Sequence, residues 1–244
     1  MRLTFLGTRG NVAVASPLHA LHSSLLVSHR GRAVMVDCGE DWLERLDALS
    51  PDAIILTHAH PDHAFGLRRG APCPVHATAE TWDALAAFPV PASQRRVLAA
   101  RTPVVIAGIG FEAFPVEHSI RAPAVGYRIA AGRGALFYAP DLVAVIDRHE
   151  ALSGAQLYIG DGATVERSLV RRERGGTRLV GHAPIRTQIG WCAAEGVGRM
   201  LVTHCGSQIV RADPDEIAER VRALGRERGV EVEIACDGLQ VLVR

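Results

Sequence analysis

Three histidines and one aspartate gather in the short segment 57–63, which reads THAHPDH. The apolar residues Ala-Ile-Ile-Leu come directly before this segment and have the length and composition of a short buried strand. His58 and His60 are two positions apart, so an extended backbone points both side chains to one side. The proline that follows ends the extension, and Asp62 and His63 then begin the next element and face a second point.

This set of side chains is typical of a site for two neighbouring divalent metal ions. Two imidazoles converge on one point, while a carboxylate and an imidazole converge on the next, which suits two metals better than one. Imidazole and carboxylate ligands without thiolate favour zinc, with manganese or iron as alternatives. A histidine-rich surface loop is the competing interpretation, but the position of the ligands at a strand end disfavours it.

The length and composition predict one globular domain over residues 1–244. A chain of 244 residues, 48% hydrophobic and 22% charged, can bury a substantial core. Its net charge of +1 disfavours a broad nucleic-acid-binding surface, which needs a clear basic excess. No apolar run has the length of a membrane span or of a secretion signal, and the five cysteines are scattered and odd in number. We therefore expect a cytoplasmic protein without membrane association.

The apolar periodicity predicts strands and helices along the whole chain. Strands are expected at 3–6, 24–27, 33–37, 53–56, 74–77, 104–106, 111–116, 124–129, 135–138, 156–159 and 199–203. Helices are expected at 41–49, 78–87, 143–152, 185–195 and 214–228. The chain should end in a hairpin of strands 230–235 and 239–243, turned at Asp237-Gly238. Strands that face strands, with helices outside, make an α/β fold of four αββα layers.

The segment 57–63 resembles the HxHxDH signature of the metallo-β-lactamase superfamily. Other segments resemble that superfamily in the expected order, namely LTFLGT at 3–8, VDCG at 36–39, VTH at 202–204 and CDG at 236–238. The resemblance therefore covers nearly the whole chain. It implies the four-layer αββα sandwich of the metallo-β-lactamase fold and a hydrolase with a dinuclear metal site.

The resemblance also implies the remaining ligands. His118 corresponds to the third histidine of the superfamily and His204 to the last, because each follows an apolar strand. The bridging carboxylate is assigned to Asp141 rather than to Asp161, because the superfamily places it on the strand that pairs with strand 126–129. The implied ligands are His58, His60, His118 and Asp141 for one metal, and Asp62, His63, Asp141 and His204 for the other.

Two divalent ions at such a site lie about 3.5–4 Å apart and share a hydroxide. Zn²⁺ is the first expectation, with Mn²⁺ or Fe²⁺ as alternatives. Coordination lowers the pKa of the bound water toward ~7, which supplies a nucleophile at neutral pH. Asp62 would orient that hydroxide or accept its proton, so we expect it to be catalytic as well as a ligand. A structural zinc site is the alternative, but such sites are usually rich in cysteine.

His182 distinguishes the branches of the superfamily. The order of His182, a helix, a strand and then His204 resembles the phosphodiesterase branch, which includes ribonuclease Z and the PhnP-type cyclic phosphodiesterase. A histidine at this place in that branch contacts the substrate phosphate and protonates the leaving oxygen, which helps because an alkoxide is a poor leaving group. A histidine that caps the following helix is the alternative interpretation.

We therefore predict a hydrolase of a small or cyclic phosphodiester that uses a metal-bound hydroxide and His182 as general acid. Extended nucleic acid is not expected, because His118 and Asp141 are only 23 positions apart, too few for the arm that grips transfer RNA. A homodimer is compatible with this prediction. The alternatives are a carboxyl-ester, thioester, lactone or β-lactam hydrolase at the same metal site, and a non-catalytic binding module. The arginines of segment 167–178 form either a solvated face or a clamp on substrate phosphate.

Overall fold

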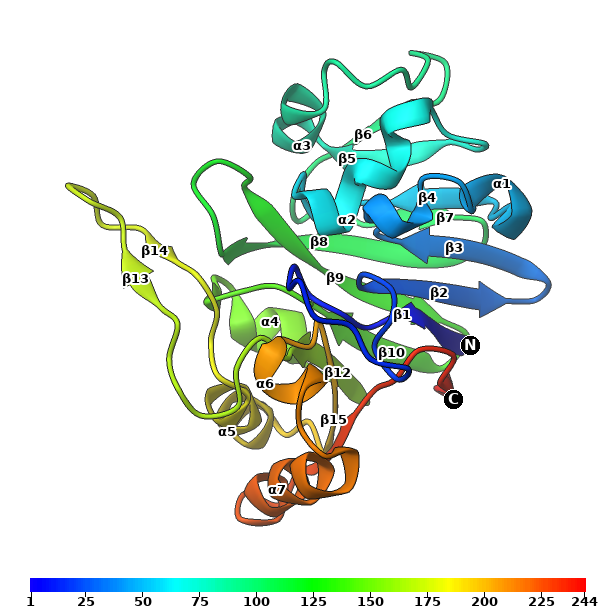
Figure 1. Cartoon of the computed structure of the whole chain (residues 1–244). Coiled ribbons are helices and arrows are strands. Elements are labelled where there is room, and N and C mark those ends of the chain that lie inside the picture. The colour runs from blue at the N-terminus through cyan, green and yellow to red at the C-terminus, as the bar shows by residue number, and fades with distance from the viewer.

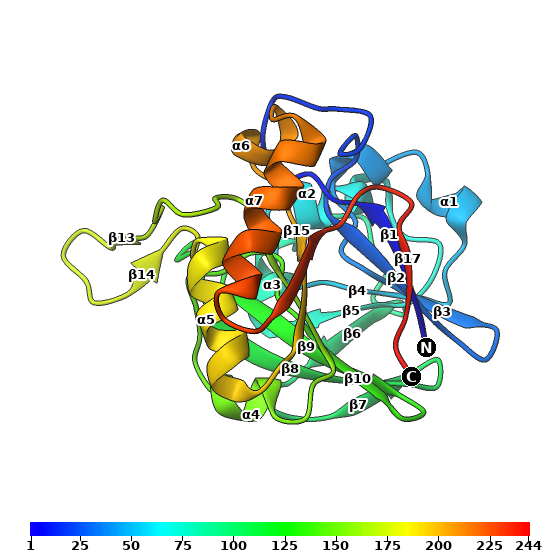
Figure 2. The ribbon, with the colours of Figure 1, turned by 90° about the horizontal axis from the view of Figure 1, so that it is seen from below.

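Two β-sheets pack face to face at the centre of the molecule, and helices cover the outer face of each (Figures 1 and 2). A computed structural model describes residues 1–244. The arrangement is the predicted four-layer αββα sandwich. None of the helices combines the length and the apolar character that crossing a lipid bilayer would require.

The first sheet contains, from edge to edge, β17 (Gln240–Leu242), β1 (Arg2–Gly7), β2 (Ser24–His29), β3 (Arg32–Val36), β4 (Ala53–Ile55), β5 (Val75–Thr78) and β6 (Arg95–Leu98). The second sheet contains β11 (Ala144–Val145), β8 (Ile109–Glu117), β9 (Ala124–Ala131), β10 (Gly134–Tyr138), β12 (Leu157–Asp161), β15 (Arg199–Thr203) and β16 (Glu231–Ile234), with β7 (Val104–Ile106) beside β8. A separate hairpin consists of β13 (Arg171–Arg172) and β14 (Leu179–Val180).

The helices of the outer layers are short, apart from two. Those beside the first sheet are η1 (Glu40–Trp42), α1 (Leu46–Leu49), α2 (Pro61–Ala64), η2 (Phe65–Arg69) and α3 (Ala79–Ala84). Those beside the second sheet are α4 (Arg148–Leu152), α5 (Ile185–Glu195), α6 (Ser207–Val210) and α7 (Pro214–Arg226).

Apolar side chains fill the three spaces between the four layers. Alternate residues of a strand face opposite sides of its sheet, so Ile55 of β4 packs between the sheets with Phe5 and Tyr127. The preceding Ile54 packs instead with Trp42, under the helices beside the first sheet. A third cluster lies between the second sheet and α4, α5 and α7. The strand β4 is therefore apolar on both faces, as expected for a strand inside a layered α/β fold.

The strands that carry the predicted site residues all end at one edge of the sandwich. In the first sheet β3 and β4 are parallel, and in the second sheet β10, β12 and β15 are parallel. Strand β8 runs in the same direction as β10, because both are antiparallel to β9. The polar residues that end or follow these strands are Asp37, His58, His118, Asp141, Asp161 and His204.

The predicted C-terminal hairpin was wrong. Strand β16 joins the second sheet parallel to β15, whereas β17 joins the first sheet antiparallel to β1. Asp237 lies where the chain crosses between the sheets, and its carboxylate accepts hydrogen bonds from Thr8 Oγ1 (2.6 Å) and from the main-chain N–H groups of Ala20 and Leu21 (2.9 Å each). The Asp-Gly pair does indicate a turn, but it does not determine whether the flanking strands pair with each other.

Two predicted helices begin late or are interrupted. The first residues of segment 143–152 form β11 against β8, so α4 begins only at Arg148. Segment 41–49 is divided into η1 and α1. The prediction for 185–195 matches α5, while β6 and the β13–β14 hairpin were not predicted.

Candidate metal centre

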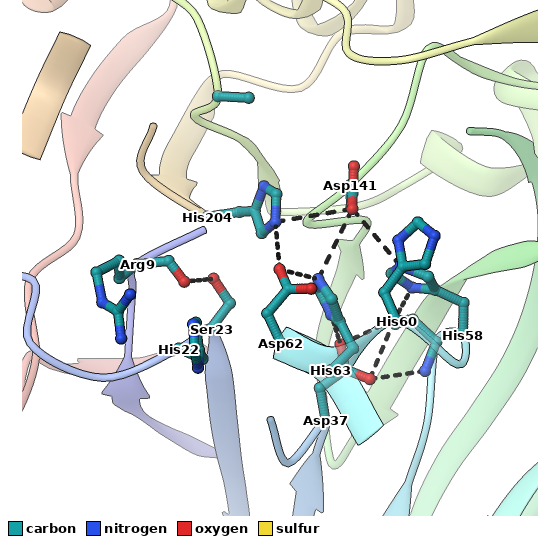
Figure 3. A network of polar contacts seen from close by, with 12 residues as sticks. Arg9, His22, Ser23, Asp37, His58, His60, Asp62, His63, Asp141 and His204 are labelled. Atoms are coloured by element: carbon teal, nitrogen blue, oxygen red, sulfur yellow. Dashed lines mark hydrogen bonds and ion pairs between the residues drawn. The ribbon is translucent and has the colours of Figure 1, made fainter. Parts of the chain in front are cut away.

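The structure brings all seven predicted ligands together at this edge of the sandwich. Figure 3 labels His58, His60, Asp62, His63, Asp141 and His204. Three overlapping groups have donor atoms within 4.8 Å of one another: His58, His60, His118 and Asp141; Asp62, His63 and His204; and Asp141, Asp161, His182 and His204. His60 and His182 are half-buried, and the others are buried. The third group includes Asp161, the competing candidate for the bridging position, and His182, the predicted general acid.

The helix α2 explains why one short segment serves two groups. His60 has an extended backbone and caps α2, and the proline after it occupies the first helical position. Asp62 and His63 therefore turn away from His58 and His60. The helix packs directly on Gly39, where an added Cβ would lie 2.2 Å from the carbonyl oxygen of Asp62.

In the first group, three imidazole nitrogens converge on one point. His60 Nδ1 lies 3.0 Å from His58 Nε2 and 3.1 Å from His118 Nε2. Burial, together with the neighbouring imidazoles, lowers the pKa of His58 well below its usual value and that of His60 to about 4. These rings are therefore neutral at pH 7, and their lone pairs are available to a metal.

In the second group, a carboxylate lies between two imidazoles. Asp62 Oδ2 is 3.3 Å from His63 Nε2 and 3.1 Å from His204 Nε2. Burial alone would lower the pKa of His63, but the carboxylates of Asp62 and Asp37 outweigh it and raise this pKa to about 10. Burial is likewise outweighed at His204, where Asp141, Asp161 and Asp62 raise the pKa to about 10. His63 Nε2 is buried without a hydrogen-bond partner, which fits a metal-binding position.

Asp141 lies between the two groups. Its Oδ2 is 3.6 Å from His58 Nε2 and 3.7 Å from the Nε2 atoms of both His63 and His204. Its Oδ1 is buried and lies 2.8 Å from His118 Nδ1 and 2.9 Å from His182 Nδ1, although neither contact has the geometry of a hydrogen bond. Burial raises the pKa of this carboxyl, but His118 and His204 outweigh it and hold the pKa well below its usual value.

Asp161 is engaged differently, although it lies nearby. Its two oxygens accept main-chain hydrogen bonds from Ala163 (2.8 Å) and Leu142 (3.2 Å), and Oδ2 is also 2.9 Å from His182 Nδ1. Both oxygens of Asp161 therefore already accept a main-chain hydrogen bond. The contacts of the two aspartates therefore favour Asp141 over Asp161 as a carboxylate shared by two metals.

Protein groups hold the far ring nitrogen of four histidines, which aims the other nitrogen at the site. The pairs are His58 Nδ1 with Thr57 Oγ1 (3.0 Å), His63 Nδ1 with Asp37 Oδ2 (2.9 Å), His118 Nδ1 with Gly181 O (3.2 Å) and His204 Nδ1 with Asp161 Oδ1 (3.4 Å). Such outer partners are typical of histidines that bind metals. Asp37 was missed as a functional residue, although a carboxylate directly after a buried strand was the signal for it.

His182 lies at the rim of the site, with its side chain 25% exposed. Burial lowers its pKa, but Asp161 and Asp141 outweigh burial and raise it to about 11. The buried Gln188 of α5 fixes this corner: its Nε2 donates to the carbonyl oxygens of Asp161 (2.8 Å) and Ala183 (2.9 Å), and its Oε1 accepts from Asp161 N and Tyr158 Oη (2.9 Å each). No sequence signal distinguished Gln188 from other polar residues of a helix.

A pocket of about 640 Å³ opens above these side chains. His60, Asp62, His118, Asp141, His182 and His204 line it, together with Gly10, Asn11 and Val12 of the N-terminal loop. His19 and His22 anchor that loop: His19 Nδ1 is 2.8 Å from Thr8 Oγ1, and His22 Nδ1 is 2.8 Å from Asp41. Both are buried, and neither lines the pocket.

Residues 32–205 match the family described as the beta-lactamase superfamily domain. The chain belongs to the β-lactamase superfamily. This confirms the resemblance, and the superfamily is one of metal-dependent hydrolases. Among curated proteins, the chain is 37% identical over 73 residues to a ribonuclease Z of Alkaliphilus oremlandii, which covers 28% of this chain and only 22% of that protein.

Two further β-lactamase superfamily proteins resemble the chain over most of its length. A ribonuclease Z of Mycobacterium marinum is 25% identical over 233 residues, which cover 79% of this chain and 83% of that protein. A crystal structure of a diphosphatase of the PhnP family superimposes with a TM-score of 0.74 at 20% identity, over 100% of this chain and 98% of the other. At that identity the superposition establishes the common fold.

Proposed function

We propose that this protein hydrolyses small or cyclic phosphodiesters with two divalent metal ions, Zn²⁺ first and Mn²⁺ or Fe²⁺ as alternatives. The observation that carries the proposal is the position of His182. Its Nδ1 is held 2.9 Å from Asp161 Oδ2, and the ring lines the pocket beside the two groups of metal-binding side chains. An oriented imidazole at that place suits protonation of a poor leaving group.

The buried and half-buried donors fit the metals in number and in type. His58, His60, His118 and Asp141 would hold one ion, and Asp62, His63, Asp141 and His204 the other. When bound, the two ions would supply Lewis acidity, which activates water and neutralises phosphate oxygens. Asp141 would be shared, because it alone faces nitrogen atoms of both groups.

The protein's own groups would then move the protons. The Asp62 carboxylate faces the pocket and can orient the attacking water or accept its proton. His182 would donate the proton that the leaving oxygen needs, while Asp161 keeps Nδ1 of the ring engaged and favours the imidazolium. The ribonuclease Z relatives and the PhnP-family diphosphatase support a phosphorus-oxygen bond as the target.

A substrate panel tests the proposal. Purified, metal-loaded protein should hydrolyse bis-p-nitrophenyl phosphate faster than a thioester, a lactone or nitrocefin. Activity restricted to the last three would move the protein to carboxyl hydrolysis, which uses the same metal site without needing His182.

Replacing His182 with alanine tests its role directly. The His182→Ala variant should keep two metals, while turnover of a phosphodiester with an alkyl leaving group falls by about 10²–10⁴. From a p-nitrophenyl ester, p-nitrophenolate leaves without protonation, so hydrolysis of that ester should fall less. Equal losses on both esters, or a missing metal, would contradict the role of general acid.

A further inference from the structure

A basic hairpin projects from the pocket wall away from the body of the molecule (Figures 1 and 2). We call residues 167–180, which include β13 and β14, the arginine arm. It carries five exposed arginines, Arg167, Arg171, Arg172, Arg174 and Arg178. None of the five forms an ion pair with an acidic side chain, whereas some arginines elsewhere do, such as Arg148 with Glu195 and Arg220 with Glu166.

The near-neutral charge of the whole chain conceals this feature. The arginine arm has five arginines and one acidic residue, a net charge of +4, while the rest has 22 arginines and 25 acidic residues, a net charge of −3. A compact patch of one sign on a body of the other sign attracts an oppositely charged ligand to that patch. The argument from the net charge against nucleic acid therefore does not apply to the arm.

The base of the arm is fixed to the candidate metal centre. The N–H of Gly181 donates to the carbonyl oxygen of His118 (2.9 Å), and the N–H of Leu169 donates to that of His182 (3.3 Å). Gly181 has a φ of +111°, and an added Cβ would lie 2.2 Å from the carbonyl oxygen of Leu169, so glycine is required there. Arg167 also lines the pocket. The arm is therefore an extension of the pocket wall.

The spacing of the charges indicates a ligand longer than the pocket. Arg178 directly precedes β14, and a bend at Gly181 separates that strand from His182, so Arg178 lies on the hairpin and does not line the pocket. Arg174 lies at the far turn of the hairpin. Guanidinium groups bind phosphate well, and the arm has no aromatic side chain on which a base could stack. The ligand that fits is a chain of phosphates, contacted through its backbone.

We propose that the arginine arm binds the phosphate backbone of a single-stranded oligonucleotide while one of its phosphodiesters occupies the pocket. This inference rests on the proposed phosphodiesterase function and extends its substrates from small phosphodiesters to short single strands. Backbone contacts of this kind position a strand without reading its sequence. The arm should therefore favour longer strands, whatever their bases.

A matched pair of variants tests the proposal. R171Q/R172Q/R178Q removes three charges from the arm, and R2Q/R133Q/R228Q removes three exposed, unpaired arginines elsewhere. Binding of a fluorescent, phosphorothioate-linked single-stranded hexanucleotide to the metal-loaded protein should weaken about 10- to 100-fold in the arm variant only. The slope of log K against log salt concentration should fall by about 2, since each lost phosphate contact on a single strand contributes roughly 0.7. Turnover of bis-p-nitrophenyl phosphate should stay within twofold in both variants.

Equal binding by the two variants, an unchanged salt slope, or tighter binding of duplex than of single strand would overturn the proposal. The experiment can refute the phosphodiesterase function and the role of the arm separately, because the binding measurement does not need turnover. An arm-dependent oligonucleotide affinity without phosphodiesterase activity would refute the proposed function alone. Phosphodiesterase activity without arm dependence would refute only the role of the arm.

Discussion

The two halves of the candidate metal centre hold protons differently, although both consist of histidines and aspartates at the same strand ends. In the half around His58 and His60, burial and neighbouring imidazoles lower the histidine pKa values, that of His60 to about 4. In the half around His63 and His204, carboxylates outweigh burial and raise both pKa values to about 10. Without metal, the first half is a cluster of neutral rings and the second is a network of ion pairs.

This difference teaches how each half would accept a metal. A metal ligand must be deprotonated, so metal binding releases any proton that the ligand carries. In the first half, His58 and His60 carry no such protons at neutral pH, so a metal could bind their free lone pairs directly. In the second half, His63 and His204 must each lose a proton when the metal binds. The carboxylates of this half would stabilise the protonated histidines before binding and the metal ion after it.

Removing the residue common to both halves should have the largest effect. Asp141→Asn should reduce the metal content from two equivalents per chain and abolish hydrolysis, because Asp141 lies between His58, His63 and His204. Metal analysis of the purified, folded variant measures this. Asp161→Asn is the comparison variant and should keep the first metal and at most weaken the second, because Asp161 also holds His204 Nδ1 (3.4 Å). The reverse pattern would transfer the bridging position to Asp161.

A substitution in one half should weaken the binding of one metal more than that of the other. Asp37 holds His63 Nδ1 directly (2.9 Å) and reaches His58 only indirectly, because it accepts from Thr57 Oγ1 (2.8 Å), which lies 3.0 Å from His58 Nδ1. Asp37→Asn should therefore lower the affinity for the second metal by about 10- to 100-fold, as loss of an outer partner usually does. Stepwise chelator titration distinguishes the metals. An equal loss of both metals would mean that Asp37 supports His58 through Thr57 as much as it supports His63.

In the metal-free protein, the two halves should make the free energy of unfolding depend on pH in opposite ways. The raised pKa values of His63 and His204 contribute stability that is complete below pH 6.5 and lost as the pH rises through about 10. The lowered pKa of His60 acts oppositely, so stability falls as the pH drops from 6.5 toward about 4. Urea unfolding in EDTA measures both limbs. His60→Gln should flatten the acid limb only, and a change in both limbs would contradict the assignment.

The sequence predicted the parts of this centre that lie in short, strongly patterned segments. The HxHxDH segment and the histidines after apolar strands could be located because each follows a recognisable strand end. The contacts that aim them were not predicted, because Asp37 meets His63, Asp161 meets His204 and Gln188 meets Asp161 only through the packing of separate elements. The crossing of the C-terminal strands between the sheets was missed for the same reason, since the contacts of Asp237 are more than two hundred residues distant in the sequence.

The smallest expected effect concerns a residue two contacts away from the second half. Tyr158 donates to Gln188 (2.9 Å), Gln188 holds the main chain of Asp161, and Asp161 orients His182 and His204. Tyr158→Phe removes one of the two hydrogen bonds to Gln188 Oε1, and Asp161 N still satisfies that oxygen. Unfolding free energy should therefore fall by only about 0.5–1.5 kcal/mol, with both metals retained. Gln188→Met leaves the buried N–H and C=O of Asp161 unpaired, so it should cost more and should also slow alkyl phosphodiesters more than p-nitrophenyl esters. If Tyr158→Phe and Gln188→Met behaved alike, the corner around His182 would be held by packing rather than by these hydrogen bonds.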